Sequence, residues 1–344
     1  MKNILFYDTK PYDKEYFEKF NSKYQIEYTD VKLSAKTAVL AKGFDGVCAF
    51  VNDVIDAKAI EKLYKCGVKV IAMRCAGYSN IDFKAAYKKI NVVRVPAYSP
   101  FAVAEHTMAL LLGINRQIHK AYNRIKEHNF SIVGLTGTDL HGKTVGVIGT
   151  GKIGKCFINI CKGFCMKVLA YDLFPDKNAG LEYVSLDDLL KNSDVISLHC
   201  PLTEQTNRII NADAFSKMKK GVYLLNTSRG ALIETEALLD ALNDGTVKAA
   251  GLDVYEEEND LFFEDNSNTL IKDDVLSLLI SKPNVLLTSH QAFLTREALE
   301  TIAKITLSNL DAFFDGKPLE NEVCYHCNGN NLENCIKNQN GRCF

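Results

Sequence analysis

The 344-residue chain contains no tryptophan, few prolines and no block of lysines or arginines. Its 41 basic and 42 acidic residues leave a net charge of −1, whereas nucleic acids and anionic membranes attract a strongly basic face. The sequence also lacks the run of about 20 apolar residues that crosses a bilayer. Its first residues read as a strand, without the apolar core and cleavage site of a signal peptide. We therefore expect a cytoplasmic protein with no nucleic-acid or membrane partner.

Eleven cysteines are present, and in a cytoplasmic protein most should be reduced and buried as small apolar groups. Four of them gather near the C-terminus: Cys324, Cys327, Cys335 and Cys343. Together they could hold a zinc ion, but only the first pair has the C-x-x-C spacing of zinc sites. The favoured interpretation is a flexible, polar, Cys-rich tail over residues 324–344, with thiols that are free or adventitiously oxidised and no bound metal.

Short segments rich in β-forming residues alternate with longer helical ones along most of the chain. This alternation predicts parallel sheets with helices on both faces. The expected strands are Ile4–Tyr7, Gln25–Tyr28, Gly46–Phe50, Val68–Met73 and Val92–Val95, followed by Thr144–Ile148, Lys167–Tyr171, Val195–His199, Val222–Asn226, Ala249–Val254 and Val285–Thr288.

A long helical stretch from near Ala102 separates the two series of strands. A second helical pattern, over residues 296–315, is expected to return to the first series. These features predict a first domain of residues 1–100 and 297–323, a second domain of residues 101–296, and the tail. The apolar run from Met108 to Leu112 is wider than one amphipathic stripe, so it should pack at a domain or subunit interface. We therefore expect a homo-oligomer, either a dimer or a tetramer.

The strand expected at Thr144–Ile148 leads directly into a G-x-G-x-x-G turn formed by Gly149, Gly151 and Gly154. A helix and a second strand follow, and that strand ends in Asp172. In this context the glycines permit a tight turn, the approach of a pyrophosphate and close helix–strand packing, and the acid binds a ribose. No basic residue directly follows Asp172 to accept a 2′-phosphate, so NAD is expected rather than NADP. The sequence predicts an α/β fold of two doubly wound parallel-sheet domains, with a Rossmann-type NAD domain inserted into a flavodoxin-like substrate domain.

Three later strands end in chemically useful groups, namely Arg229, Glu258 and His290. The carboxyl ends of parallel strands open onto one crevice, so these side chains should meet there. A planar guanidinium suits a substrate carboxylate. Histidine, which ordinarily titrates near pH ~6.5, suits proton donation to a carbonyl, and an acid can orient its ring. Each residue alone could be structural, but the three together favour reduction of a 2-keto acid.

Several motifs resemble the D-isomer-specific 2-hydroxyacid dehydrogenase family, over nearly the whole chain to about residue 320. They are Arg74-Cys75-Ala76-Gly77, Gly149–Gly154, His199-Cys200-Pro201-Leu202-Thr203, Asn226-Thr227-Ser228-Arg229-Gly230, Gly251–Glu258 and His290. The resemblance implies that Arg229, Glu258 and His290 form the catalytic set. It also implies that backbone groups of Ala76 and Gly77 bind the substrate carboxylate. The implied cofactor contacts are Lys152, Ile153, Asp172, Cys200, Pro201, Thr227, Ser228, Arg229 and Asp253, in addition to the three glycines.

Within this family, the segments around residues 95–100, 260–265 and 290–295 resemble fermentative D-lactate dehydrogenases. That likeness implies contact of Tyr98 with the substrate carboxylate and of Phe293 with its methyl side. The expected function is therefore NADH-dependent reduction of pyruvate to D-lactate, which regenerates NAD during fermentation. A larger 2-keto acid, or an NAD-sensing role without turnover, is the alternative. For His106 we favour a structural role, and nothing indicates a catalytic thiol at Cys75 or Cys200.

Overall fold

The computed structural model describes residues 1–258, 261–323, 325 and 336–344. The chain forms two compact units, one comprising Met1–Ser99 with Thr295–Phe344 and the other Pro100–Leu294. The expected domains were 1–100 with 297–323, and 101–296. At the two points where the chain passes from one unit to the other, these bounds differ from the observed ones by one or two residues. The helical pattern expected over residues 296–315 is α11 (Arg296–Phe314), which belongs to the first unit.

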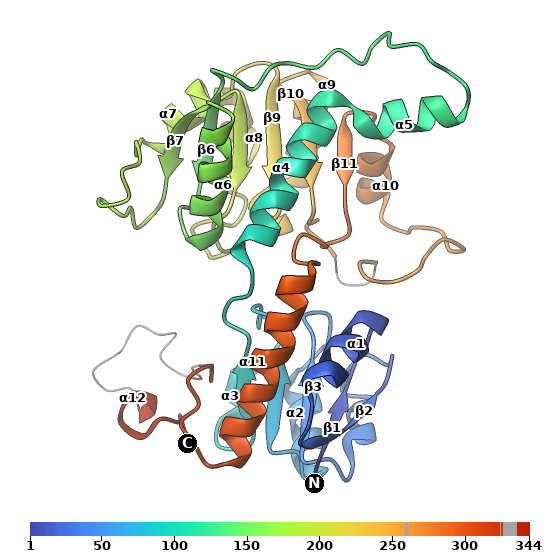
Figure 1. Cartoon of the computed structure of the whole chain (residues 1–344), viewed down its shortest axis with the longest axis vertical. Coiled ribbons are helices and arrows are strands. Elements are labelled where there is room, and N and C mark those ends of the chain that lie inside the picture. Colours follow the sequence, from blue (N-terminus) through green and yellow to red (C-terminus); the bar gives the residue numbers. More distant parts are fainter. Residues whose placement is uncertain (259–260, 324, 326–335) are drawn as a thin grey trace. The chain divides into compact units, whose positions relative to one another are not determined.

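The first unit contains a five-stranded parallel sheet in the order β2-β1-β3-β4-β5 (Figure 1). This is the flavodoxin-like order expected for the fold. The strands are β1 (Lys2–Phe6), β2 (Tyr24–Tyr28), β3 (Gly46–Ala49), β4 (Val70–Met73) and β5 (Asn91–Arg94). The helices are α1 (Pro11–Phe20), η1 (Ala38–Ala41), α2 (Ala57–Lys65), α3 (Phe83–Ala86), α11 and α12 (Ile336–Asn340). Helix α11 packs against α1 and against β4 and β5.

The second unit contains a six-stranded parallel sheet in the order β11-β10-β9-β8-β6-β7. Its strands are β6 (Thr144–Ile148), β7 (Lys167–Tyr171), β8 (Val195–Leu198), β9 (Val222–Asn226), β10 (Val247–Leu252) and β11 (Val285–Leu287). A single parallel bridge joins Ala170 of β7 to Tyr183, at the place where a Rossmann sheet has its third strand. The expected strands are thus all confirmed, and the Rossmann order is kept with one strand reduced to a bridge.

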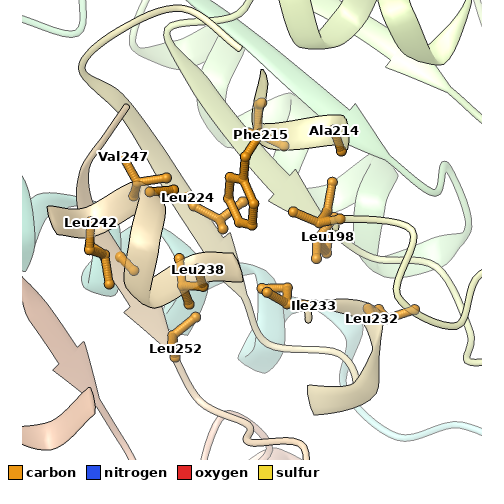
Figure 2. Close-up of a cluster of buried hydrophobic side chains, with 14 of the residues drawn as sticks. Leu198, Ala214, Phe215, Leu224, Leu232, Ile233, Leu238, Leu242, Val247 and Leu252 are labelled. Carbon is orange, nitrogen blue, oxygen red and sulfur yellow. The ribbon is translucent and has the colours of Figure 1, made fainter. Parts of the chain in front are cut away.

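Helices cover both faces of this second sheet. They are α4 (Pro100–Arg116), α6 (Lys152–Gly163), α7 (Leu186–Asn192), α8 (Ala212–Lys217), η2 (Gly230–Leu232), α9 (Thr235–Asn243) and α10 (Asp274–Ser281). Helix α5 (Ile118–Lys126) also belongs to this unit but has no buried residue. Successive side chains of β9 point to opposite faces. Tyr223 and Leu225 pack with the cluster under α4 and α6, whereas Leu224 packs with the cluster under α8 and α9. Figure 2 shows the latter cluster, with Leu224, Phe215 and Leu238 close together. Burial on both faces holds the strand ends, and hence the loops that follow them, in fixed positions.

The described part of the C-terminal tail lies against the first unit. The backbone N–H of Val92 donates to the Tyr325 hydroxyl at 2.6 Å, and that of Cys343 donates to Glu322 Oε2 at 2.7 Å. The Arg342 guanidinium donates to two carbonyls at the end of α11, and the ring of Phe344 packs on that of Tyr325. Residues 342–344 thus make backbone and aromatic contacts that the expectation of a flexible tail did not include.

The four tail cysteines are the residues that could together hold a zinc ion. Cys343 is buried, and Cys324, Cys327 and Cys335 lie outside the described residues. Within the described ranges, no group of His, Cys, Asp and Glu side chains is arranged to hold a metal ion. In those same ranges, no helix is both long and apolar enough to cross a membrane.

Candidate active site

The glycine-rich turn after β6 forms a cradle that larger residues could not make. Gly149 has a φ of +96°, and a Cβ there would lie 2.5 Å from the backbone N of Cys200. A Cβ on Gly154 would lie 2.1 Å from the carbonyl oxygen of Gly149. By contrast, a Cβ on Gly151 would meet nothing within 4 Å. Two glycines thus pack backbone against backbone, and the third faces open space at the N-terminus of α6, where a phosphate group fits.

Asp172, at the end of β7, is fixed beside this turn. Its carboxylate accepts hydrogen bonds from Thr150 N at 2.7 Å, Thr150 Oγ1 at 3.0 Å and Phe174 N at 2.9 Å. Partial burial favours the neutral acid, but these hydrogen bonds outweigh it and lower the pKa of Asp172. The acid is therefore charged and already oriented. Sequence reasoning missed Thr150, which occupies an unconstrained position of the glycine motif.

A cavity of about 230 Å³ lies in front of the turn and Asp172, with walls that include His199, Cys200 and Pro201. Burial lowers the pKa of His199 to about 3 and raises that of Cys200 to about 11, so both side chains are neutral near pH 7. A neutral, largely apolar wall beside a charged acid and an open helix N-terminus fits an adenosine and its pyrophosphate. Lys152 and Ile153, also expected at this site, form the first turn of α6.

The turn after β9 presents Arg229 at the surface of the second unit. The Asn226 amide donates to the carbonyl of Arg229 at 2.8 Å, and its oxygen accepts from the N–H of Ser228 at 3.0 Å. A Cβ on Gly230 would lie only 1.9 Å from the backbone of Tyr255, so this glycine lets the turn lie directly on the loop after β10. Arg229 is exposed and makes no ion pair with any described carboxylate. Its guanidinium is thus available for an anionic ligand.

Two neighbours of Arg229 in the sequence hold the turn in place. Thr227 shares a hydrogen bond of 2.7 Å with Thr107 of α4, and Ser228 Oγ donates to the carbonyl of Cys200 at 2.7 Å. These contacts join the turn after β9 to the cofactor cavity and to α4. The sequence assigned Thr227 and Ser228 to the cofactor, and of the two, Ser228 contacts the cavity-wall residue Cys200.

Glu258 and His290 lie together although they follow different strands. His290 Nδ1 is 2.7 Å from Glu258 Oε2, and Glu258 Oε1 accepts from the N–H of Tyr255 at 2.9 Å. His290 has a φ of +49°, a backbone conformation that non-glycine residues seldom adopt and that is concentrated at functional sites. Its second ring nitrogen, Nε2, has no hydrogen-bond partner among the described residues. The pair therefore offers an oriented imidazole with one nitrogen free for a ligand.

Asp253 organises the turn that carries His290. Its buried carboxylate accepts from Gln291 N at 2.9 Å, Ala292 N at 2.8 Å and Thr288 Oγ1 at 2.5 Å. Burial favours the neutral form, but these bonds and the His106 ring, whose Nε2 lies 3.5 Å from Oδ1, lower the pKa of Asp253. The sequence assigned Asp253 to the cofactor; the protein contacts of its carboxylate are with the turn that carries His290 and with His106 of α4.

The residues expected to bind substrate are divided between the units. Phe293 follows His290 in the second unit and is buried. Ala76, Gly77 and Tyr98 lie after β4 and β5 in the first unit. The carbonyl of Ala76 accepts from Arg94 at 2.8 Å, but the N–H groups of Ala76 and Gly77 donate to no described acceptor. The second unit thus carries Arg229, Glu258 and His290, the three residues predicted to be catalytic, while the first carries two backbone donors without a described acceptor.

The fold and this site define a nicotinamide-dependent dehydrogenase. The model of the "D-isomer specific 2-hydroxyacid dehydrogenase, NAD binding domain" family matches residues 108–292. The chain is 53% identical to a 2-hydroxyacid dehydrogenase homolog of Haemophilus influenzae, over 93% of this chain and 98% of that protein. It is 50% identical to the D-lactate dehydrogenase of Escherichia coli, over 93% and 99% respectively. The solved structure of the pyruvate reductase of Chlamydomonas reinhardtii superimposes with a TM-score of 0.88 at 43% identity, covering 93% of this chain and 98% of that one.

The chain belongs to the D-isomer-specific 2-hydroxyacid dehydrogenase family, and its cofactor is NAD.

Proposed function

We propose that this enzyme reduces pyruvate to D-lactate with NADH, reversibly, and that it regenerates NAD in the cytoplasm during fermentation. The observation that carries the proposal is the Glu258–His290 pair, with the unpaired Arg229 on the neighbouring strand end. The name of the Escherichia coli relative, D-lactate dehydrogenase, and that of the Chlamydomonas protein, pyruvate reductase, support the choice of substrate.

The residues divide the chemistry between them. Arg229 binds the substrate carboxylate through a two-pronged contact. The N–H groups of Ala76 and Gly77 are proposed as further donors to a carboxylate. His290 Nε2 donates a proton to the carbonyl oxygen, while Glu258 stabilises the charged ring. When bound, NADH supplies the hydride that the carbonyl carbon accepts. One hydride and one proton convert the ketone to the alcohol, and in the reverse reaction His290 takes the proton back.

For the choice of pyruvate we propose two aromatic residues, each with its own role: Tyr98 contacts the substrate carboxylate, and Phe293 contacts its methyl group. Aromatic walls suit a three-carbon acid. One methylene changes transition-state binding by only about 1–3 kcal/mol, so larger 2-keto acids should react more slowly rather than not at all.

We also propose that the enzyme is a homo-oligomer built through an apolar arm, which comprises residues 118–133. Helix α5 within the arm has no buried residue, and Ile118, Tyr122 and Ile125 are each more than half exposed. Their spacing of four and three residues puts them on one helix face. Phe130 and Ile132 are also exposed, and exposed apolar side chains gathered on one segment are typical of a protein–protein contact surface. A second copy of the chain is the proposed partner.

A direct test combines product analysis with two substitutions. Wild-type enzyme with NADH and pyruvate should yield D-lactate on chiral chromatography. His290→Ala should lose about a hundredfold or more in kcat while still binding NADH, because the proton donor is missing. Arg229→Ala should in addition raise KM for pyruvate. Near-normal turnover by His290→Ala would refute its role, and a much larger kcat/KM with a longer 2-keto acid would refute pyruvate as the substrate.

A further inference from the structure

We propose that His106, on α4, is a positioning residue for His290 that acts through Thr288 and Asp253. The proposal rests on the proposed role of His290 as proton donor. It differs from the purely structural role that the sequence suggested for His106.

The distances between the polar atoms of His106, Thr288 and Asp253 show which atoms of this network carry the hydrogens. Thr288 Oγ1 lies 2.5 Å from Asp253 Oδ1 and 3.1 Å from His106 Nε2. The carboxylate of Asp253 is charged, so it cannot donate, and the single hydroxyl hydrogen of Thr288 must point to it. The hydroxyl oxygen is then an acceptor toward His106. His106 therefore donates from Nε2, and the chain of donation runs from His106 to Thr288 to Asp253.

This chain ends at the group that fixes the catalytic turn. The Asp253 carboxylate holds the N–H groups of Gln291 and Ala292, and its backbone carbonyl accepts from the N–H of His290 at 2.8 Å. His290 sits between these bonds with a φ of +49°. A non-glycine residue keeps a positive φ only when the contacts around it hold the backbone in that conformation. Without its partner Thr288, the carboxylate could turn and release the two N–H groups.

His106 supplies a support from outside the turn. The other members of the network, Asp253 and Thr288, directly follow β10 and β11, whereas His106 lies on α4. Its Nε2 is also 3.5 Å from Asp253 Oδ1, and its side chain is 19% exposed. It is thus not an apolar filler of the core. A donor on a separate, packed helix gives the oxygen of the Thr288 hydroxyl a second partner, so that this side chain is held from two sides.

Two amide substitutions of similar polarity distinguish a positioning role of His106 from a role in packing alone. In His106→Gln the side-chain amide nitrogen can reach the place of Nε2, whereas in His106→Asn it reaches only the place of Nδ1. We expect His106→Asn and His106→Leu to lower kcat with pyruvate about tenfold to a hundredfold, because displacement of a catalytic group costs up to that factor. KM for pyruvate and the Kd for NADH, measured by NADH fluorescence, should change less than about twofold. His106→Gln should recover most of kcat.

The control is His141→Leu, which removes an exposed histidine of the same unit and should leave kcat unchanged. If His106→Leu does not fold, the comparison of the Gln and Asn variants decides. Equal kcat for these two variants, or normal kcat in His106→Leu, would overturn the proposal. His290→Gln is measured in parallel: if it retains turnover, the proposed function itself has failed, and if it is inactive while the His106 variants are normal, only the positioning role has failed.

Discussion

Glu258 Oε2 lies 2.7 Å from His290 Nδ1, and this contact joins the loop after β10 to the loop after β11. Both side chains are about one-fifth exposed, so the pair is reached from solvent but partly shielded from it. The contact fixes which ring nitrogen faces the protein and which faces a ligand. It also places an anion beside a ring that must be charged before it can donate a proton.

Replacing this anion should impair the proton transfer more than the binding steps. Glu258→Gln keeps a hydrogen-bond acceptor for the ring but removes the negative charge that stabilises the imidazolium. We expect kcat for pyruvate reduction to fall by about a hundredfold or more, with the Kd for NADH unchanged. Steady-state kinetics and NADH fluorescence titration measure the two quantities. Glu257→Gln, at the neighbouring solvated acid, is the control, and equal losses in the two variants would contradict this assignment.

The glycines of the cofactor turn should respond differently to the same added methyl group. Gly154→Ala places a Cβ 2.1 Å from the carbonyl of Gly149, so the helix and turn must separate. This should destabilise the protein by about 1–3 kcal/mol or more and weaken NADH binding. Gly151→Ala meets no protein atom within 4 Å, so it should fold normally and weaken only NADH binding. Urea unfolding without cofactor, compared with NADH titration, distinguishes the two effects. A destabilised Gly151→Ala would show that this position does not face the pyrophosphate.

The glycine turn and the two sheets could be predicted from the sequence because a local pattern of residues encodes each of them. The spacing of Gly149, Gly151 and Gly154 after an apolar segment defines the turn, and the alternation of segments defines both sheets. Contacts between distant segments could not be read in this way. Thr150 holds Asp172, and Glu322 holds the N–H of Cys343, yet neither residue has a distinctive sequence pattern. The third Rossmann strand is a single bridge at Tyr183, too short to give a periodic signal.

Asp172 should determine the preference for NADH. Its charge, maintained by Thr150 and Phe174, favours a ribose with free hydroxyls and repels a 2′-phosphate. Asp172→Ala should raise the Kd for NADH about tenfold or more. It should also lower the preference for NADH, measured as kcat/KM with NADH divided by kcat/KM with NADPH. The control is Asp176→Ala, which removes another nearby charge, one that pairs with Lys155 at the surface. An unchanged cofactor ratio in Asp172→Ala would refute the assignment.

His199 should make the second unit sensitive to acid. Burial lowers its pKa from 6.5 to about 3, so the folded protein keeps the ring neutral while the unfolded chain binds a proton below pH 6.5. The unfolded state is therefore favoured by about 1.4 kcal/mol for each pH unit as the pH falls from 6.5 toward 3. The midpoint of thermal unfolding should fall over this window. In His199→Gln, which cannot titrate, the fall should be shallower. Parallel curves for the two proteins would show that His199 does not carry this dependence.

The apolar arm, residues 118–133, should hold two copies of the chain together. Arg124 donates to the carbonyls of Ser131 and Val133, so the segment after α5 is tied back to the helix and forms one surface with it. Ile125 lies on the exposed apolar face, and Asn123 lies beside it at an exposed polar position.

A lysine at position 125 would bury a charge in the proposed interface, and such burial is strongly unfavourable without a partner. Light scattering after size exclusion should therefore give a dimer or tetramer for wild type and a smaller species for Ile125→Lys. Asn123→Lys adds the same charge outside the apolar face and should keep the wild-type mass. If wild type has the mass of one chain, or if both variants keep the oligomer, the arm is not the contact surface.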